Sequence, residues 1–117
     1  MRTSDATVDP QLHEEILSLL PELIAGIHSP QEAREFVNSF LSEKEIEVFS
    51  KRLAIVFWLK KGKSYKEIKD GIKVSSATVA SVQDIINRPG IELAIKILEA
   101  NEWALRMSER IRRIVGK

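Results

Sequence analysis

Residues 64–86 combine side chains that can bind the phosphates and base edges of a nucleic acid. Tyr65, Lys66 and Lys69 fall on one short predicted helix, from which they would reach backbone phosphates. A second predicted helix opens with residues 75–78 (Ser-Ser-Ala-Thr), whose small side chains let a helix N-terminus approach a phosphate or a base edge. Five apolar residues would pack the two helices together as a helix-turn-helix: Ile68, Ile72, Val74, Val79 and Val82.

The turn between these two helices departs from the usual helix-turn-helix pattern at one residue. Lys73 stands at the turn position that is normally Gly, and Gly71 lies two residues earlier. A Lys in the left-handed conformation costs on the order of 1 kcal/mol, which a folded domain tolerates.

Charge is distributed unevenly along the 117 residues, although the formal net charge is only +1. Residues 1–50 carry three Lys or Arg against ten Asp or Glu, whereas residues 51–88 carry nine against three. This asymmetry predicts an anionic partner for the basic middle of the chain. The alternative is that the lysines only solubilise the surface and that residues 64–86 form an ordinary helical hairpin.

Several residues in the sequence mark helix boundaries. The alternation of apolar and polar residues that is typical of a strand is absent. Asp9-Pro10 is typical of a helix start, and Gly62 of the residue that follows a helix end. Three Ser-x-x-Glu sequences predict further helix starts with capping boxes: Ser29 to Glu32, Ser42 to Glu45 and Ser64 to Glu67.

The pattern therefore predicts one all-α domain over residues 1–117 with about six helices. Pro21 should kink or split the first helix. The apolar faces of the first and last helices are too wide for the core of one small chain, so a second copy is expected to cover them in a homodimer. The predicted helices span about 10–28, 30–41, 43–61, 64–72, 75–86 and 90–115, with residues 10–61 as dimerisation helices, 64–86 as the helix-turn-helix and 90–115 as one long C-terminal helix.

Several classes of function are not expected from this composition. The chain has no Cys, which excludes a thiolate metal site and a thiol nucleophile, and its two histidines, His13 and His28, are far apart in sequence. No catalytic motif is present, so we expect neither an enzyme nor a metal site. No apolar run is long enough to span a membrane and no signal peptide opens the chain, so the expected compartment is the cytoplasm.

The stretch FLSEKEIEVFSKRLAIVFWLKKGKSYKEIK (residues 40–69), together with VSSATVASV (residues 74–82), resembles the Trp repressor superfamily, especially its YerC/YecD-like branch. The resemblance implies a Trp-repressor-like helical bundle, an intertwined homodimer, and a repressor that inserts its helix-turn-helix into the major groove of double-stranded DNA. It also implies the DNA-binding positions, which are Tyr65, Lys66, Lys69, Ser75, Ser76, Ala77, Thr78, Ala80 and Ser81.

The resemblance further implies where a small ligand would bind. Tryptophan-binding members use a Ser or Thr at the start of the third helix, an Arg within it, and a Thr and an Arg on the recognition helix. The matching positions here are Ser42, Arg52, Thr78 and Ser81. Because Ser81 replaces the Arg that would stack on the indole ring, tryptophan is not expected as a corepressor, and the DNA-binding face loses one cation.

Beyond Pro89 the chain is longer than the short last helix of that family, and its end is basic: Arg110, Arg112, Arg113 and Lys117. These side chains could bind DNA or an acidic partner, or they could simply favour the negative end of a helix. Two other functions stay open. The helical dimer could be a protein–protein interaction module without DNA readout, or it could bind RNA, for which exposed stacking aromatics are scarce.

Overall fold

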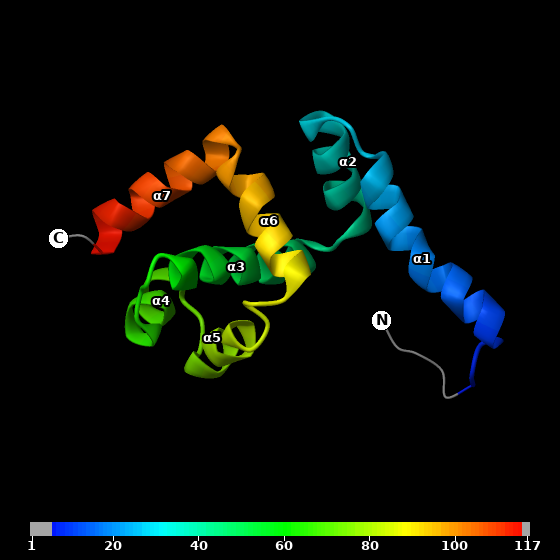
Figure 1. The fold of residues 1–117 in the computed structure, drawn as a ribbon, viewed down its shortest axis with the longest axis horizontal. Helices are drawn as coiled ribbons and strands as arrows, with labels where there is room; N and C mark the ends of the chain where they lie inside the picture. The colour runs from blue at the N-terminus through cyan, green and yellow to red at the C-terminus, as the bar shows by residue number, and fades with distance from the viewer. Residues whose placement is uncertain (1–5, 116–117) are drawn as a thin grey trace. The chain divides into compact units, whose positions relative to one another are not determined.

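The computed structural model describes residues 6–115, except for the side chains of residues 102–105, and over these residues it contains seven α-helices and no strand (Figure 1). The predicted all-α class is therefore confirmed. The chain divides into two compact units, Met1–Glu43 and Lys44–Lys117.

The first unit contains two helices, α1 (Pro10–Gly26) and α2 (Pro30–Phe40). The side chain of Asp9 caps α1 by accepting a hydrogen bond from the N–H of Leu12 at 3.2 Å. Ser29 caps α2 by accepting from the N–H of Glu32 at 3.1 Å. Both helices therefore begin where the sequence predicts. Pro21 lies inside α1, which continues through it as one helix and is not split.

Neither helix of the first unit contains a buried residue. The apolar side chains of α1 are exposed instead, with Leu17 and Leu19 each 63% exposed. Exposed apolar surface on this scale is unfavourable in water and is typical of a face that another protein covers.

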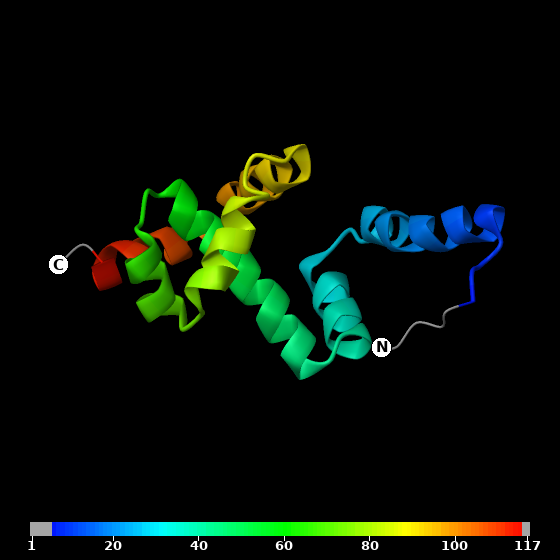
Figure 2. The ribbon, with the colours of Figure 1, turned by 90° about the horizontal axis from the view of Figure 1, so that it is seen from below.

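The second unit holds the remaining helices and the buried core. These helices are α3 (Glu43–Lys60), α4 (Tyr65–Ile72), α5 (Ser76–Gln83), α6 (Pro89–Glu99) and α7 (Glu102–Val115). Four consecutive residues near the end of α3, Ile55 to Trp58, are at most 3% exposed. Consecutive residues point to different sides of a helix, so α3 must be covered on several sides here. Its end lies among the other helices of the unit (Figures 1 and 2).

The core joins α3 to all four later helices. It includes Ile68 from α4, Val79 and Val82 from α5, Ile95 from α6 and Ile111 from α7. Ile72 and Val74 pack against this cluster while partly exposed. The predicted apolar contacts between the two helices of the helix-turn-helix are therefore confirmed.

The C-terminal part of the chain corrects the sequence prediction. Instead of one long helix over 90–115 there are two, α6 and α7, which makes seven helices where about six were expected. The break falls at Ala100 and Asn101, whose N–H groups bond to the carbonyls of Lys96 and Leu98 at 3.2 and 3.1 Å. Helix α5 is also shorter than predicted, because residues 84–87 form turns.

Candidate nucleic-acid interface

The helix-turn-helix is preceded by a tight C-terminal cap on α3. Gly62 has φ +80° and donates its N–H to the carbonyl of Leu59 at 3.0 Å, while Lys63 donates to Trp58 at 3.1 Å. This pair of bonds is a Schellman motif with Gly at the C′ position, as the sequence predicts. The motif ends α3 and turns the chain into α4 within a few residues.

A complete capping box starts α4. The Ser64 hydroxyl accepts from the N–H of Glu67 at 3.1 Å, and the Glu67 carboxylate accepts from the N–H of Ser64 at 3.0 Å. Hydrogen bonding from the Ser64 backbone to the carboxylate holds the pKa of Glu67 below its ordinary value. The predicted start of the first helix of the motif is confirmed.

The turn after α4 places Lys73 in the left-handed region, with φ 65° and ψ 57°. It is the only non-glycine residue with positive φ among residues 6–115. The N–H groups of Lys73 and Val74 both bond to the carbonyl of Lys69, at 3.0 and 3.3 Å. The expectation that Lys73 takes the conformation usually given to Gly is confirmed.

Gly71 has a different role, which sequence reasoning missed. A Cβ added to Gly71 would lie 2.5 Å from Cη2 of Trp58 and 2.7 Å from its Cζ3. The absence of a side chain at this position of α4 therefore lets α4 pack directly on the indole ring of α3. No local pattern in the sequence reveals this contact, because it joins two separate helices.

The N-terminus of α5 presents small polar side chains to solvent. Ser75 caps the helix by accepting from the N–H of Thr78 at 3.1 Å, and the two hydroxyls lie 2.9 Å apart. The Ser81 hydroxyl donates to the carbonyl of Thr78 at 2.8 Å. Ser76 and Ala77 are exposed, as are Ser75, Thr78 and Ser81, whereas Ala80 is half-buried. The first turn of α5 is thus open to a ligand, and the hydroxyl of Ser75 is already engaged by the helix.

The residues of α4 that were expected to contact phosphates are Tyr65, Lys66 and Lys69, and all three are exposed. The ammonium of Lys66 forms a salt bridge with Asp70, with Nζ 2.9 Å from Oδ2. This hydrogen bond raises the pKa of Lys66 and lowers that of Asp70. A phosphate that approaches Lys66 therefore competes with a carboxylate on the same helix.

The helix-turn-helix geometry has a counterpart among known families. A family model for the Trp repressor protein matches residues 15–99 of the chain. The chain belongs to the Trp repressor family. Members of this family are helix-turn-helix transcription regulators that bind DNA and are not enzymes, so α4 and α5 form a DNA-binding motif. No curated protein and no solved structure gives a significant match to the chain.

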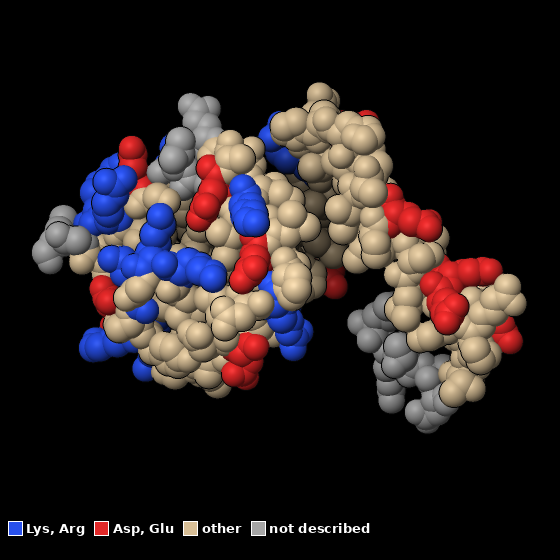
Figure 3. Space-filling view, in the orientation of Figure 1, with Lys and Arg blue, Asp and Glu red and all other residues tan. Residues whose placement is uncertain are grey.

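The family match covers α2 to α6 completely and α1 from residue 15 onward. The last helix, α7, lies outside it. The wider surface of the second unit is rich in Lys and Arg, with blue side chains gathered over the part that holds α4 and the C-terminal part of α7 (Figure 3). Of the four basic residues expected at the C-terminus, Lys117 lies outside the described residues.

Four positions were expected to bind a ligand in this protein. Three of them line one pocket. Arg52, Thr78 and Ser81 surround a space of about 350 Å³ between α3 and α5. The fourth, Ser42, belongs to the first unit and is not a lining residue. Glu47 and Lys51 also line the pocket and form a salt bridge of 3.2 Å. A hydrogen bond from Lys51 and the nearby charge of Lys44 lower the pKa of Glu47.

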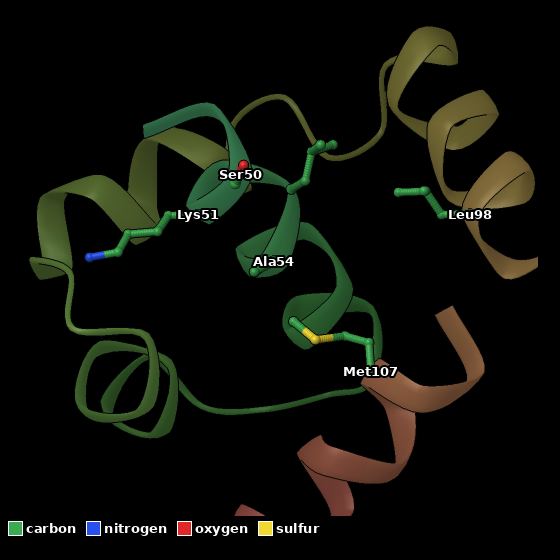
Figure 4. A pocket seen from close by; sticks show the side chains of 6 residues that line it. Ser50, Lys51, Ala54, Leu98 and Met107 are labelled. Atoms are coloured by element: carbon green, nitrogen blue, oxygen red, sulfur yellow. The ribbon is translucent and has the colours of Figure 1, made fainter. Parts of the chain in front are cut away.

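A second pocket of the protein is an apolar groove of about 450 Å³ (Figure 4). Its side chains come from three helices of the second unit: Ser50, Lys51, Leu53 and Ala54 from α3, Leu98 from α6 and Met107 from α7. Leu53 is 39% exposed although it is apolar. The groove contains few polar groups and is suited to apolar side chains.

Among the described residues, no three His, Cys, Asp or Glu side chains gather in a way that could hold a metal ion. None of the seven described helices is long and apolar enough to cross a membrane.

Proposed function

We propose that the protein is a transcriptional repressor that binds a two-fold DNA operator as a homodimer through α4 and α5. The observation that carries this proposal is the open N-terminal turn of α5, where exposed small residues begin the second helix of the helix-turn-helix in a chain of the Trp repressor family. A helix N-terminus of this kind can enter the major groove and place its first residues against base edges.

The proposed contacts divide into two kinds. Ser76 and Ala77 would lie closest to the bases, because Ser75 and Thr78 already share hydrogen bonds within the helix. Tyr65, Lys66 and Lys69 on α4 would bind backbone phosphates and so fix the orientation of α5. Ala80 and Ser81 complete the proposed DNA-facing side.

The proposed homodimer rests on apolar surface that one chain leaves uncovered. Helices α1 and α2 bury no residue of their own, and α3, α6 and α7 together form an apolar groove. A second copy is the proposed cover for both surfaces, with residues 10–61 as the main dimerisation helices, because two-fold pairs let each copy protect the other. Sedimentation equilibrium should give twice the mass of the chain, and Leu53→Glu in the groove should shift the protein toward monomer. A monomeric wild-type protein would contradict the proposed dimer.

Selection of bound sequences from a random duplex library tests the repressor proposal directly. At about 150 mM salt, loose electrostatic binding is weakened and specific sites dominate. Enrichment of a two-fold symmetric site, with half-sites about one helical turn apart, is the expected result. The matched control is Ser76→Glu, which sets a carboxylate against the DNA and should enrich nothing. Equal enrichment by wild type and Ser76→Glu would show that α5 does not read the site.

The proposed effector site is the pocket lined by Arg52, Thr78 and Ser81. Its cations would suit a small anionic molecule, but Ser81 cannot stack on an indole ring as Arg does. We propose that the protein belongs to the YerC/YecD-like branch, and we expect it to bind DNA without tryptophan. Adding L-tryptophan should leave both the thermal midpoint and the DNA affinity unchanged; an increase in either would contradict this assignment.

A further inference from the structure

A small pocket beside the C-terminal cap of α3 has three cationic residues among the five that line it. The pocket encloses about 240 Å³, and its lining residues are Lys61, Lys63, Ser108, Ile111 and Arg112. Three of these five side chains are cationic, one carries a hydroxyl, and none is a carboxylate. No position in this pocket was singled out by the helix-turn-helix pattern.

The cap on α3 fixes one wall of the pocket. Lys61 and Lys63 flank Gly62, whose positive φ closes the Schellman motif. The backbone N–H groups of Lys61, Gly62 and Lys63 all bond to carbonyls of α3, at 3.0 to 3.1 Å. An anion in the pocket would therefore be bound by side chains and not by the backbone.

Helix α7 supplies the other wall, and its core contact sets the rotation of the helix. Ile111 is 2% exposed and belongs to the core cluster that includes α3 and α4 residues. Ser108 lies three residues before Ile111 and four before Arg112, so it neighbours both on the surface of α7, and all three line the pocket. The position of the hydroxyl and the guanidinium thus follows from packing.

The cations of this pocket differ from two other cations of the same unit. Lys51 and Lys66 each form a salt bridge within their own helix. Over the described part of the chain, no salt bridge involves Lys61, Lys63 or Arg112. Lys63 does help to lower the pKa of Glu67, but that carboxylate is already bound by the N–H of Ser64. Three cations that line one pocket without a salt bridge are free to bind an anion there.

We propose that this pocket binds a backbone phosphate of DNA and extends the helix-turn-helix contact onto α7. The location favours DNA over an acidic protein, because Lys63 directly precedes Ser64, the N-cap of α4, and the exposed Tyr65 and Lys66 of α4 are the proposed phosphate contacts. The same face of the molecule gathers Lys and Arg over α4 and the C-terminal part of α7 (Figure 3). The inference rests on the proposed function, and it adds a helix that lies outside the family match.

The test compares wild-type protein with Lys61→Ala/Arg112→Ala on a mixed-sequence duplex of about 40 base pairs. Binding is measured between about 50 and 200 mM salt, where each neutralised phosphate contributes about 0.9 to the slope of log affinity against log salt. The double variant should lower that slope by about one unit, as expected for the loss of one phosphate contact, and weaken binding to all sequences alike. Both side chains are exposed, so the variant should keep its helicity by circular dichroism.

Two further variants make the test specific. Ser108→Asp keeps every cation but adds a carboxylate to the pocket, and it should weaken duplex binding as well. Lys96→Ala removes an exposed cation of α6 that lines none of the pockets described above, and it should leave the slope unchanged.

The outcomes separate this inference from the function on which it rests. Wild-type protein that failed to bind any duplex would overturn both. Wild-type binding with an unchanged slope in Lys61→Ala/Arg112→Ala and in Ser108→Asp would overturn the phosphate pocket alone. If the same variants kept DNA binding but lost binding to poly-glutamate, the pocket would belong to an acidic protein segment instead.

Discussion

Gly71 of α4 lies against the indole ring of Trp58 in α3, so closely that a Cβ on Gly71 would lie 2.5 Å from Cη2 of the ring. Trp58 is 3% exposed, and its Nε1 has no hydrogen-bond partner among the described residues. The indole therefore stays in place through packing alone. Because α4 lies directly on this ring, the contact sets how the first helix of the DNA-binding motif sits on the core.

Gly71→Ala should destabilise the protein by about 1–3 kcal/mol, since the new methyl group has to displace a buried ring. The measurement is urea unfolding followed by circular dichroism. Gly90→Ala is the matched control, because nothing lies within 4 Å of the added Cβ and Ala is the better helix former. Trp58→Phe in the Gly71→Ala background should recover part of the loss, because Phe lacks the outer ring atoms. No recovery would show that the cost arises elsewhere.

Lys73→Gly should stabilise the protein by about 1 kcal/mol. Lys73 has φ 65°, and the left-handed conformation is strained for Lys and free of strain for Gly. Lys69→Gly is the matched control inside α4, where Gly should instead cost about 1 kcal/mol. Thermal or urea unfolding of the two variants should thus give shifts of opposite sign. Destabilisation by both substitutions would contradict the strain assigned to Lys73.

Local features of the fold were predictable from sequence because each involves only a few neighbouring residues. The caps at Asp9, Ser29 and Ser64, the C′ residue Gly62 and the left-handed Lys73 all follow from the chemistry of single turns. The break near Asn101 was missed because apolar residues continue on both sides of it, so periodicity alone indicates one helix.

Contacts between separate helices were not predictable in the same way. Gly71 packs on Trp58, which lies 13 positions earlier in the chain. Lys61 and Arg112 line one pocket although they are 51 positions apart. Composition placed the cations in the basic middle and at the C-terminus, but only the anchoring of α7 by Ile111 brings the two groups to one pocket. The open first turn of α5 was predictable because Ser75 to Thr78 are small and adjacent in the chain.

Acid should weaken the start of α4, and Glu67 is the group responsible. Its pKa is lowered in the folded state, so its stabilising effect is full above the ordinary value of 4.5 and is lost as the pH falls through the lower folded value. Glu67→Gln should therefore lose less stability than wild type between about pH 7 and pH 3. Ser64→Ala should cost about 1 kcal/mol near neutral pH and should also reduce the acid dependence, since it removes the cap that the carboxylate completes. If the stability of wild type and of Glu67→Gln fell equally with pH, Glu67 would not be the group responsible.

Substitutions of Lys66 and Asp70 should move DNA affinity in opposite directions, although the two side chains form one salt bridge of 2.9 Å. Lys66→Ala removes a proposed phosphate contact and leaves Asp70 facing the DNA, so it should lower affinity for every sequence and reduce the salt slope by about one unit. Asp70→Asn removes the competing carboxylate and frees the ammonium, so it should raise affinity.

Glu99→Gln at the end of α6 makes the same change of charge away from α4 and should have little effect. The pair is exposed and contributes little to folding, so unfolding curves should barely move while binding changes. A rise in affinity as large in Glu99→Gln as in Asp70→Asn would point to net charge alone; a rise confined to Asp70→Asn would identify Lys66 as a direct contact.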